Sequence, residues 1–186
     1  MEKRMKDRRF RRTEEKILTV FFDEAKKDTT IVKIAKKAKI GRSTIYTHHH
    51  AFRDILPDYQ RYMLVEYSRT MKKFLMRKNV PLKKLFFEML VFIMRNRKIF
   101  KLFLELGNLE VFKQMLKRLE SRLTSALRLP KNSRKIFSIY VSEIVQVIAN
   151  WGEVGFSEQK LESVLGDIVY LSETCRSRLM PISVEI

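Results

Sequence analysis

A short polar segment near the N-terminus, Arg42 to about His49, holds residue types suited to nucleic-acid recognition. An arginine guanidinium, such as that of Arg42, can donate two hydrogen bonds to the O6 and N7 atoms of guanine. The hydroxyl groups of Ser43 and Thr47 can reach base edges or phosphate oxygens. The segment is too polar for a core helix, so its chemistry indicates a helix whose outer face contacts DNA.

The residues of this region also have purely structural interpretations. Any single lysine nearby, such as Lys33 or Lys36, is by itself more typical of a solvated surface than of a phosphate contact. Ile45 is expected in the core, and Tyr46 can serve packing instead of DNA contact.

Three consecutive histidines, 48–50, suggest a metal site at first sight. Successive side chains on a helix point about 100° apart, so three in a row cannot ligate one ion. The sequence also has no Glu-x-x-His pair, no nucleophile constellation and no glycine-rich phosphate loop. We therefore predict no metal, no cofactor and no enzymatic activity.

The elements around the polar segment form a helix-turn-helix pattern. An amphipathic helix is expected from Thr13 to about Lys27. Thr30 can cap a second short helix whose inner face holds Ile34 and Ala35. The turn Lys39-Ile40-Gly41 then leads into the polar helix.

Longer periodic segments follow, and Pro57 is expected to kink the first of them or to delay its regular start to near Asp54. The apolar spacing predicts helices over about 52–77, 81–95, 96–106, 109–127, 133–151 and 157–179, with Asn96 and Ser133 as caps of two of them. Five glycines and four prolines in 186 residues are too few for the turns of a sandwich or barrel. The predicted fold class is all-α, with an N-terminal three-helix helix-turn-helix domain, a C-terminal helical bundle and about nine helices in total.

The charge is large and unevenly distributed. The chain has 39 Lys and Arg against 21 Asp and Glu, a formal net charge of +18. Residues 61–135 hold 20 basic against five acidic residues, whereas residues 136–186 hold three against seven. A basic surface attracts a polyanion at long range, and the C-terminal third suits burial against protein. With 45% hydrophobic residues the chain can fill a core, so the charge does not mark a disordered tail.

The sequence predicts a soluble protein of the cytoplasm. Its single cysteine, Cys175, excludes an internal disulfide and fits a reducing compartment. The basic N-terminus leads into no apolar segment of the kind that secretory signals have. The longest uncharged apolar stretch, 144–152, is far below the ~18 residues that a membrane span needs.

Residues 30–56, TIVKIAKKAKIGRSTIYTHHHAFRDIL, resemble the DNA-binding signature of the tetracycline-repressor (TetR) family. The positions in register with the family pattern are Thr30, Ile34-Ala35, Ala38, Ile40, Thr44, Ile45-Tyr46 and His48, with Ile17-Leu18 and Phe21-Phe22 matching its first helix. The resemblance covers roughly residues 12–56 and implies that the third helix enters the major groove.

The chain departs from the family pattern at several positions. Lys39 stands where the family has the turn glycine, Gly41 where it has the capping serine, Ser43 where it has glycine, and His49 and Phe52 where it has Phe and Lys. Glycine is a slightly weaker cap than serine, by only tenths of a kcal/mol. The missing lysine removes one phosphate contact, which Arg53 can replace.

The resemblance and the polar helix together give the candidate interface. The predicted DNA-binding residues are Thr30, Lys39, Gly41, Arg42, Ser43, Thr44, Tyr46, Thr47, His48 and Arg53. Of these, Thr44, Tyr46 and His48 match positions that grip phosphate in the family. The basic arm before the first helix is expected to add salt-sensitive contacts.

A helix-turn-helix reads few base pairs, so affinity normally comes from a dimer with recognition helices about 34–36 Å apart. The last two helices are rich in Ile, Val and Leu, as obligate interfaces are, and in TetR-like proteins they form a four-helix dimer bundle. The segment 96–151 also resembles the C-terminal domain of a Gram-positive TetR subgroup. The predicted interface residues are Tyr140, Ile144, Val147, Ile148, Val164, Ile168 and Leu171.

Aromatic residues of the second part of the chain are candidates for an effector pocket. They are Phe86, Phe92, Phe100, Phe103, Phe112, Phe137, Tyr140 and Trp151. Each can equally be a core residue, because cores produce the same helical spacing. The expected domains are a basic arm, 1–12, a DNA-binding domain, 13–56, and an effector-binding and dimerisation domain, 57–186.

The combined prediction is a dimeric, sequence-specific DNA-binding transcriptional regulator of a palindromic operator. The resemblance implies a repressor released by a small-molecule effector. Two alternatives stay open: a basic nucleic-acid-binding protein without sequence specificity, suggested by the charge of residues 61–135, and a regulator controlled by a protein partner.

Overall fold

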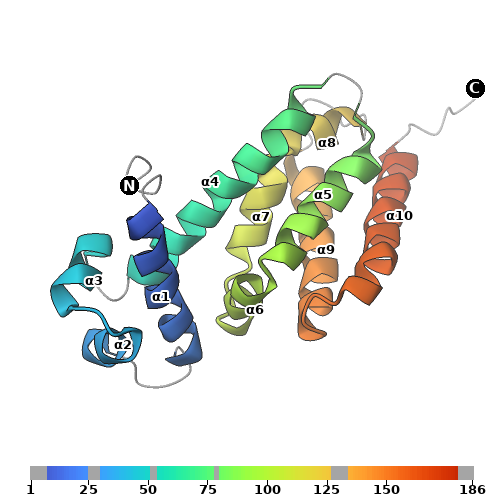
Figure 1. Ribbon diagram of the computed structural model, residues 1–186. Coiled ribbons are helices and arrows are strands. Elements are labelled where there is room, and N and C mark those ends of the chain that lie inside the picture. The colour runs from blue at the N-terminus through green and yellow to red at the C-terminus, as the bar shows by residue number, and fades with distance from the viewer. Residues whose placement is uncertain (1–7, 25–29, 51–53, 78–79, 127–133, 180–186) are drawn as a thin grey trace, which may run out of the picture. The chain divides into compact units, whose positions relative to one another are not determined.

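The computed structural model describes residues 8–24, 30–50, 54–77, 80–126 and 134–179, and all regular structure in these ranges is helical (Figure 1). This confirms the predicted all-α fold class. Ten α-helices and one short 3-10 helix are described, against about nine predicted helices. The chain divides into two compact units, Met1–Tyr62 and Met63–Ile186.

The first unit contains α1 (Arg8–Glu24), α2 (Ile31–Ala38), α3 (Arg42–His48) and the start of α4 (Ile55–Leu75). Helix α1 packs on α2, and α2 packs on α3. The small core is built from the apolar positions that helical periodicity places inward: Ile17, Leu18, Phe21, Ile34, Ile45 and Ile55. Helix α4 starts beside Pro57 as the sequence predicts, because proline is tolerated in the first turn of a helix.

Helix α1 begins at Arg8, so the expected start at Thr13 is wrong and part of the predicted arm is helical. The hydroxyl of Thr13 does not cap a helix but donates to the carbonyl of Arg9, one turn earlier, at 3.1 Å. The earlier start is supported by Phe10, whose ring stacks on that of His48 with 3.8 Å between centroids.

The turn between α2 and α3 follows the expected pattern. Thr30 caps α2, since its hydroxyl accepts from the backbone N–H of Lys33. Helix α2 ends in a Schellman motif, in which Ile40 N–H bonds to the carbonyl of Ala35 and Lys39 N–H to that of Lys36. Lys39 adopts the left-handed conformation, with φ 53° and ψ 48°, that this motif usually reserves for glycine.

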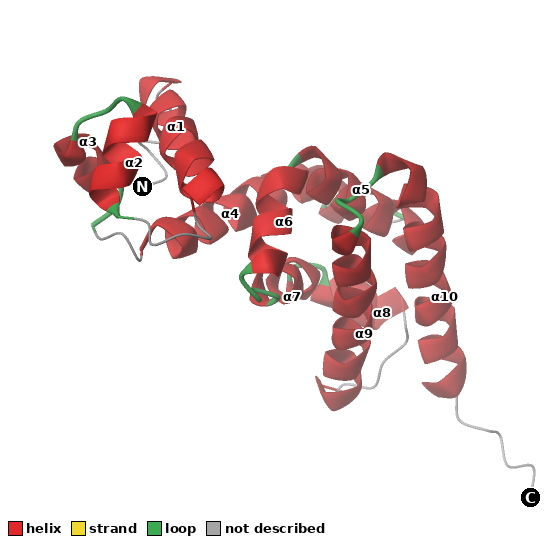
Figure 2. Cartoon of the chain, turned by 90° about the horizontal axis from the view of Figure 1, so that it is seen from below, coloured by secondary structure: helices red, strands yellow, loops and turns green. Residues whose placement is uncertain are grey.

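The second unit contains the rest of α4 and all later helices (Figure 2). They are α5 (Leu82–Arg95), α6 (Arg97–Glu105), α7 (Glu110–Lys117), α8 (Glu120–Ala126), α9 (Arg134–Glu153), η3 (Glu158–Lys160) and α10 (Leu161–Leu179). Helix α9 packs against α6, α7 and α10, and α5 packs against α6, α8 and α10. Every one of these helices except the short η3 buries an apolar face in the shared core.

Two expectations about these helices are wrong in detail. The predicted helix 109–127 is broken at residues 118 and 119, and the break lets Arg122 of α8 donate to the backbone carbonyls of Leu75 and Arg77. Asn96 stands at the start of α6, but its side chain donates to the carbonyl of Phe92 and does not cap the helix. The predicted cap of α9, Ser133, lies outside the described residues.

Candidate nucleic-acid interface

The N-terminal turn of α3 lies at the surface of the first unit. Gly41 is the N-cap, with extended φ and ψ, and its carbonyl accepts from the backbone N–H of Thr44 at 3.1 Å. Gly41, Arg42 and Ser43 are exposed, whereas Ile45 is fully buried in the core of the first unit. This arrangement leaves the Arg42 guanidinium free of the core, at the end of α3 that a major-groove helix presents to base edges.

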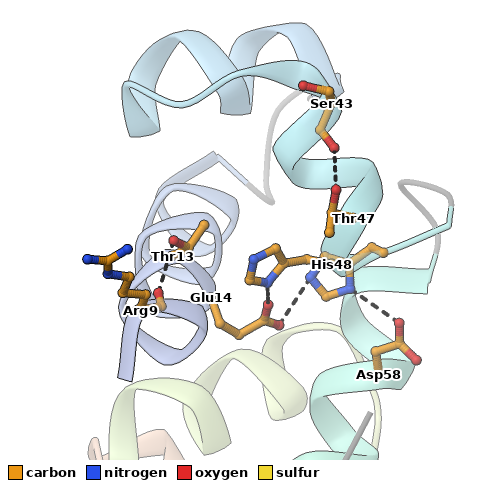
Figure 3. A network of polar contacts seen from close by, with 8 residues as sticks. Arg9, Thr13, Glu14, Ser43, Thr47, His48 and Asp58 are labelled. Carbon is orange, nitrogen blue, oxygen red and sulfur yellow. Dashed lines mark hydrogen bonds and ion pairs between the residues drawn. The ribbon is translucent and has the colours of Figure 1, made fainter. Parts of the chain in front are cut away.

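The rest of the outer face of α3 is formed by Tyr46 and Thr47. Tyr46 has 52% of its surface exposed, which favours surface contact over the packing interpretation. The hydroxyl of Thr47 donates to the carbonyl of Ser43 at 3.0 Å, so its proton is used within the helix and the oxygen keeps its capacity to accept (Figure 3). Thr44 is half-buried.

Helix α2 adds positive charge to the same unit. Lys33, Lys36 and Lys39 are exposed. The ammonium group of Lys37 pairs instead with the carboxylate of Glu24 at 2.5 Å, so it is engaged within the protein. Thr30 is exposed, although its hydroxyl already caps α2.

His48 does not lie where the sequence analysis expected it. Its side chain is only 4% exposed, and its Nδ1 donates to Oε2 of Glu14 at 2.5 Å (Figure 3). The opposite face of the ring is stacked on Phe10. The prediction that His48 grips a phosphate is therefore wrong, because this imidazole is a buried contact between α1 and α3.

The next residue, His49, completes a buried polar cluster. Its Nε2 forms an ion pair with Oε1 of Glu14 at 3.1 Å, and its Nδ1 donates to Oδ2 of Asp58 at 3.2 Å. The side chain of His49 is fully buried, and that of Glu14 is 4% exposed. The cluster of Glu14, His48, His49 and Asp58 thus joins α1, the end of α3 and the first turn of α4.

The cluster is held by opposite charges. Burial by itself would raise the pKa of Glu14, but hydrogen bonds and charge from His48 and His49 outweigh it and lower the pKa to about 2. Burial would lower the pKa of His49, but Glu14 and Asp58 outweigh it and raise that pKa above its ordinary value. Because both ring nitrogens of His49 face carboxylates, the imidazolium form of the ring is favoured, and it fixes the end of α3.

The roles of Glu14, His49 and Asp58 were not predicted from the sequence. A signal for Glu14 was available, because it precedes Ile17, Leu18 and Phe21 on the same buried face of α1. An acid at such a position needs a buried partner. Nothing local in the sequence, however, indicates that the partners are the two histidines 34 and 35 residues further on.

Other predicted contacts are placed as follows. Arg9 and Arg12 of the expected arm are exposed on α1. Arg53 and the first seven residues lie outside the described residues. Within the described residues, no group of three or more His, Cys, Asp or Glu is arranged to hold a metal ion.

The eight aromatic residues proposed for an effector pocket lie in the core of the second unit. The ring of Phe100 contacts three other rings of this set, those of Phe92, Phe103 and Phe112, with centroids 5.4 to 6.0 Å apart. Of the eight, only Trp151 borders either of the two cavities described. The rings therefore fill space instead of enclosing it, and the core interpretation fits them better than the pocket interpretation.

The predicted interface residues of α9 and α10 are mostly buried within the single chain. Ile144, Ile148, Val164 and Ile168 are buried, and the hydroxyl of Tyr140 bonds to that of Ser172 at 2.6 Å. Val147 and Leu171 are half-buried. The large apolar residues exposed in this part of the chain are instead Ile139 of α9, Val154 in the turn after α9 and Tyr170 of α10.

Searches among protein-family models, curated proteins and solved structures find no match to the chain. None of the helices in the described ranges has the length and apolarity needed to cross a membrane.

Proposed function

We propose that this protein is a sequence-specific DNA-binding transcriptional regulator of the TetR type, which reads its operator with α3. The observation that carries the proposal is the exposed turn Gly41-Arg42-Ser43 on a short helix anchored by one buried residue, Ile45. A helix that reads DNA needs one side packed firmly on its domain and the opposite side exposed to contact base edges.

The buried cluster supports this role indirectly. A guanidinium discriminates between bases only if its helix is held in one orientation, since a bidentate contact has strict geometry. Glu14 and Asp58 hold the last residues of α3 through His48 and His49. The proposed task of the two histidines is thus to position the helix, while Arg42, Ser43 and Tyr46 meet the DNA.

The electrostatics of the first unit favour a polyanion. Lys33 and Lys36 of α2 and Lys39, which follows α2, are exposed. They directly precede α3 in the sequence. Each lysine that neutralises a phosphate releases a counterion, so binding should weaken steeply with salt.

The proposal includes a homodimer, because one reading helix covers too few base pairs for operator affinity. Ile139 of α9, Val154 in the turn after α9 and Tyr170 of α10 are large apolar residues with 58 to 69% of their surface exposed. Gly166 of α10 has open space where a Cβ would stand, which would allow close approach of a second helix. These residues replace the predicted set as the proposed contact between subunits.

The test is selection of bound sequences from a random DNA pool by the full chain at physiological salt. We expect enrichment of one palindrome with two half-sites. The resemblance further implies that the protein represses transcription from this operator and that a small molecule relieves the repression. Analytical ultracentrifugation of the unliganded chain should give a dimer. A pool that stays random after several rounds would refute the proposal.

A second candidate function rests on the charge of the second unit. Residues 61–135 carry 20 basic against five acidic residues, and exposed examples such as Arg97, Lys98 and Lys113 lie outside the first unit. A protein that coats nucleic acid without reading sequence would use such a surface. It would retain affinity for every member of the pool, and substitution of Arg42 would have little effect.

A further inference from the structure

A groove of about 480 Å³ lies in the second unit, between α6, the start of α7 and the C-terminal end of α9. Leu104, Leu109 and Ala149 make its apolar surface. Figures 1 and 2 show α6 beside the end of α9, in agreement with the packing of these two helices. The volume falls in the range of about 300–1,000 Å³ that is usual for small-molecule sites.

The two helices beside the groove approach each other closely at Gly152. A Cβ atom at this position would lie 1.9 Å from Cδ1 of Leu104 and 2.9 Å from the ring of Phe156. A Cβ here would therefore force the side chains of Leu104 and Phe156 to shift, and α9 packs directly on α6 at this point. An apolar floor held in this way is formed before any ligand arrives, which lowers the entropic cost of binding.

Two glutamates and one lysine line the groove, although the chain as a whole is strongly basic. Helix α6 ends at Glu105 and α9 ends at Glu153, and both residues line the groove. The C-terminus of a helix carries a partial negative charge, which a basic residue in the last turn commonly offsets. Neither α6 nor α9 has such a residue in its last turn, and Lys101 is the one basic residue among those that line the groove.

We propose that this groove binds a small organic cation with an apolar body, that is, an aliphatic or aromatic amine. The apolar part lies on Leu104, Leu109 and Ala149, and the ammonium group lies between Glu105 and Glu153, where the two helix ends add to the attraction. An anionic ligand is disfavoured because it would meet two carboxylates and two negative helix ends against the single ammonium group of Lys101.

This site is distinct from the proposed DNA interface and does not depend on it. Its residues belong to the second unit, whereas the proposed reading helix belongs to the first. Ligand binding can be measured without DNA, so failure of one proposal leaves the other standing. An Arg42→Ala chain, with weakened DNA binding, should bind the amine unchanged.

The experiment compares three probes of similar shape on the full chain: phenylbutylamine, phenylbutanol and phenylbutyrate. Calorimetry gives the dissociation constants, and NMR shifts of the amides of α6 and α9 locate the site. We expect the amine to bind at least about fivefold more tightly than the alcohol, and the carboxylate not to saturate the groove. Equal binding of amine and alcohol, tighter binding of the carboxylate, or no binding of the amine would each overturn the proposal.

Variants of the exposed rim provide the second arm. Glu105→Gln and Glu153→Gln should each weaken amine binding about two- to fivefold, since partly exposed ion pairs contribute little individually. The matched control is Glu143→Gln, an exposed glutamate on α9 outside the groove, which should leave the dissociation constant unchanged. Unchanged affinity in the Glu105→Gln/Glu153→Gln double variant would place the amine elsewhere and refute the assignment.

Discussion

The Nε2 atom of His49 lies 3.1 Å from a carboxylate oxygen of Glu14, although the two residues are far apart in the sequence. Both side chains are buried, and Asp58 faces the other nitrogen of the same ring. A charged imidazole thus lies in the interior of the first unit, between α1, the end of α3 and α4. The proposed reading helix is held in place by an interaction that depends on protonation.

The first prediction concerns acid and alkaline loss of stability. The pKa of Glu14 is lowered from 4.5 to about 2, so its stabilisation is present above about pH 4.5 and is lost as the pH falls towards 2. The pKa of His49 is raised from 6.5, so its stabilisation is complete below pH 6.5 and is lost as the pH rises through the raised value. Hydrogen exchange of the α3 amides should show greatest protection between these limits, and His49→Gln should remove the alkaline loss. Protection that stays constant from neutral to alkaline pH in the unsubstituted chain would contradict the charged imidazole.

The second prediction concerns Glu14→Gln. The substitution leaves the buried imidazolium of His49 with one carboxylate partner instead of two, and breaking a buried ion pair typically costs about 3 kcal/mol or more. We expect a loss of about 3 kcal/mol in the free energy of unfolding of the first unit, measured by denaturant titration. Asp23→Asn, an exposed acid on the same helix, is the control and should change it by less than about 0.5 kcal/mol. Equal effects of the two substitutions would mean that the cluster contributes nothing specific.

The third prediction tests the outer face of α3. Arg42→Ala should weaken binding to the selected operator by about 1–3 kcal/mol, roughly 5- to 150-fold. Tyr46→Phe should weaken it by about 1 kcal/mol, the usual net value of one hydrogen bond. Neither should alter the oligomeric state, since both residues belong to the first unit. Gel shifts measure the affinities, with exposed Lys16→Ala of α1 as the control. If both substitutions leave the shift unchanged, α3 is not the reading helix.

The fourth prediction uses the left-handed conformation of Lys39. A residue with a Cβ is disfavoured at φ 53°, and glycine is not. Lys39→Gly should therefore raise the free energy of unfolding by about 0.5–1 kcal/mol. Lys36→Gly, at an exposed right-handed position in α2, should lower it by about 1 kcal/mol. Changes of the same sign at the two positions would contradict the Schellman geometry.

The fifth prediction compares two buried tyrosines. The hydroxyl of Tyr67 has no hydrogen-bond partner among the described residues, and burial raises its pKa. Tyr67→Phe removes this unsatisfied group, so it should leave stability unchanged or raise it by up to about 1 kcal/mol. Tyr140→Phe breaks the bond to Ser172 and should lower stability by about 1 kcal/mol. Thermal unfolding of both variants measures the difference, and a larger loss for Tyr67→Phe would show that its hydroxyl has a partner after all.

Much of the helical architecture could be predicted because it depends on neighbours in the sequence. The cap at Thr30, the turn at Lys39 and the start of α4 beside Pro57 all follow from local backbone chemistry. The buried position of Ile45 follows from helical periodicity in the same way. The break at residues 118 and 119 could not be predicted, because it accompanies a contact of Arg122 with carbonyls more than forty residues earlier.

The sequence by itself determined that the chain is helical and that α3 has one buried and one polar side. Only the tertiary structure decided which polar residues on α3 are available to a partner. His48 and Arg42 are both polar residues of one short helix, yet the first is buried against Glu14 while the second is exposed. The same holds for α9 and α10, whose apolar residues are divided between core and surface by their packing on each other. Local periodicity shows which side chains share a face, but the element that covers that face comes from a distant part of the chain.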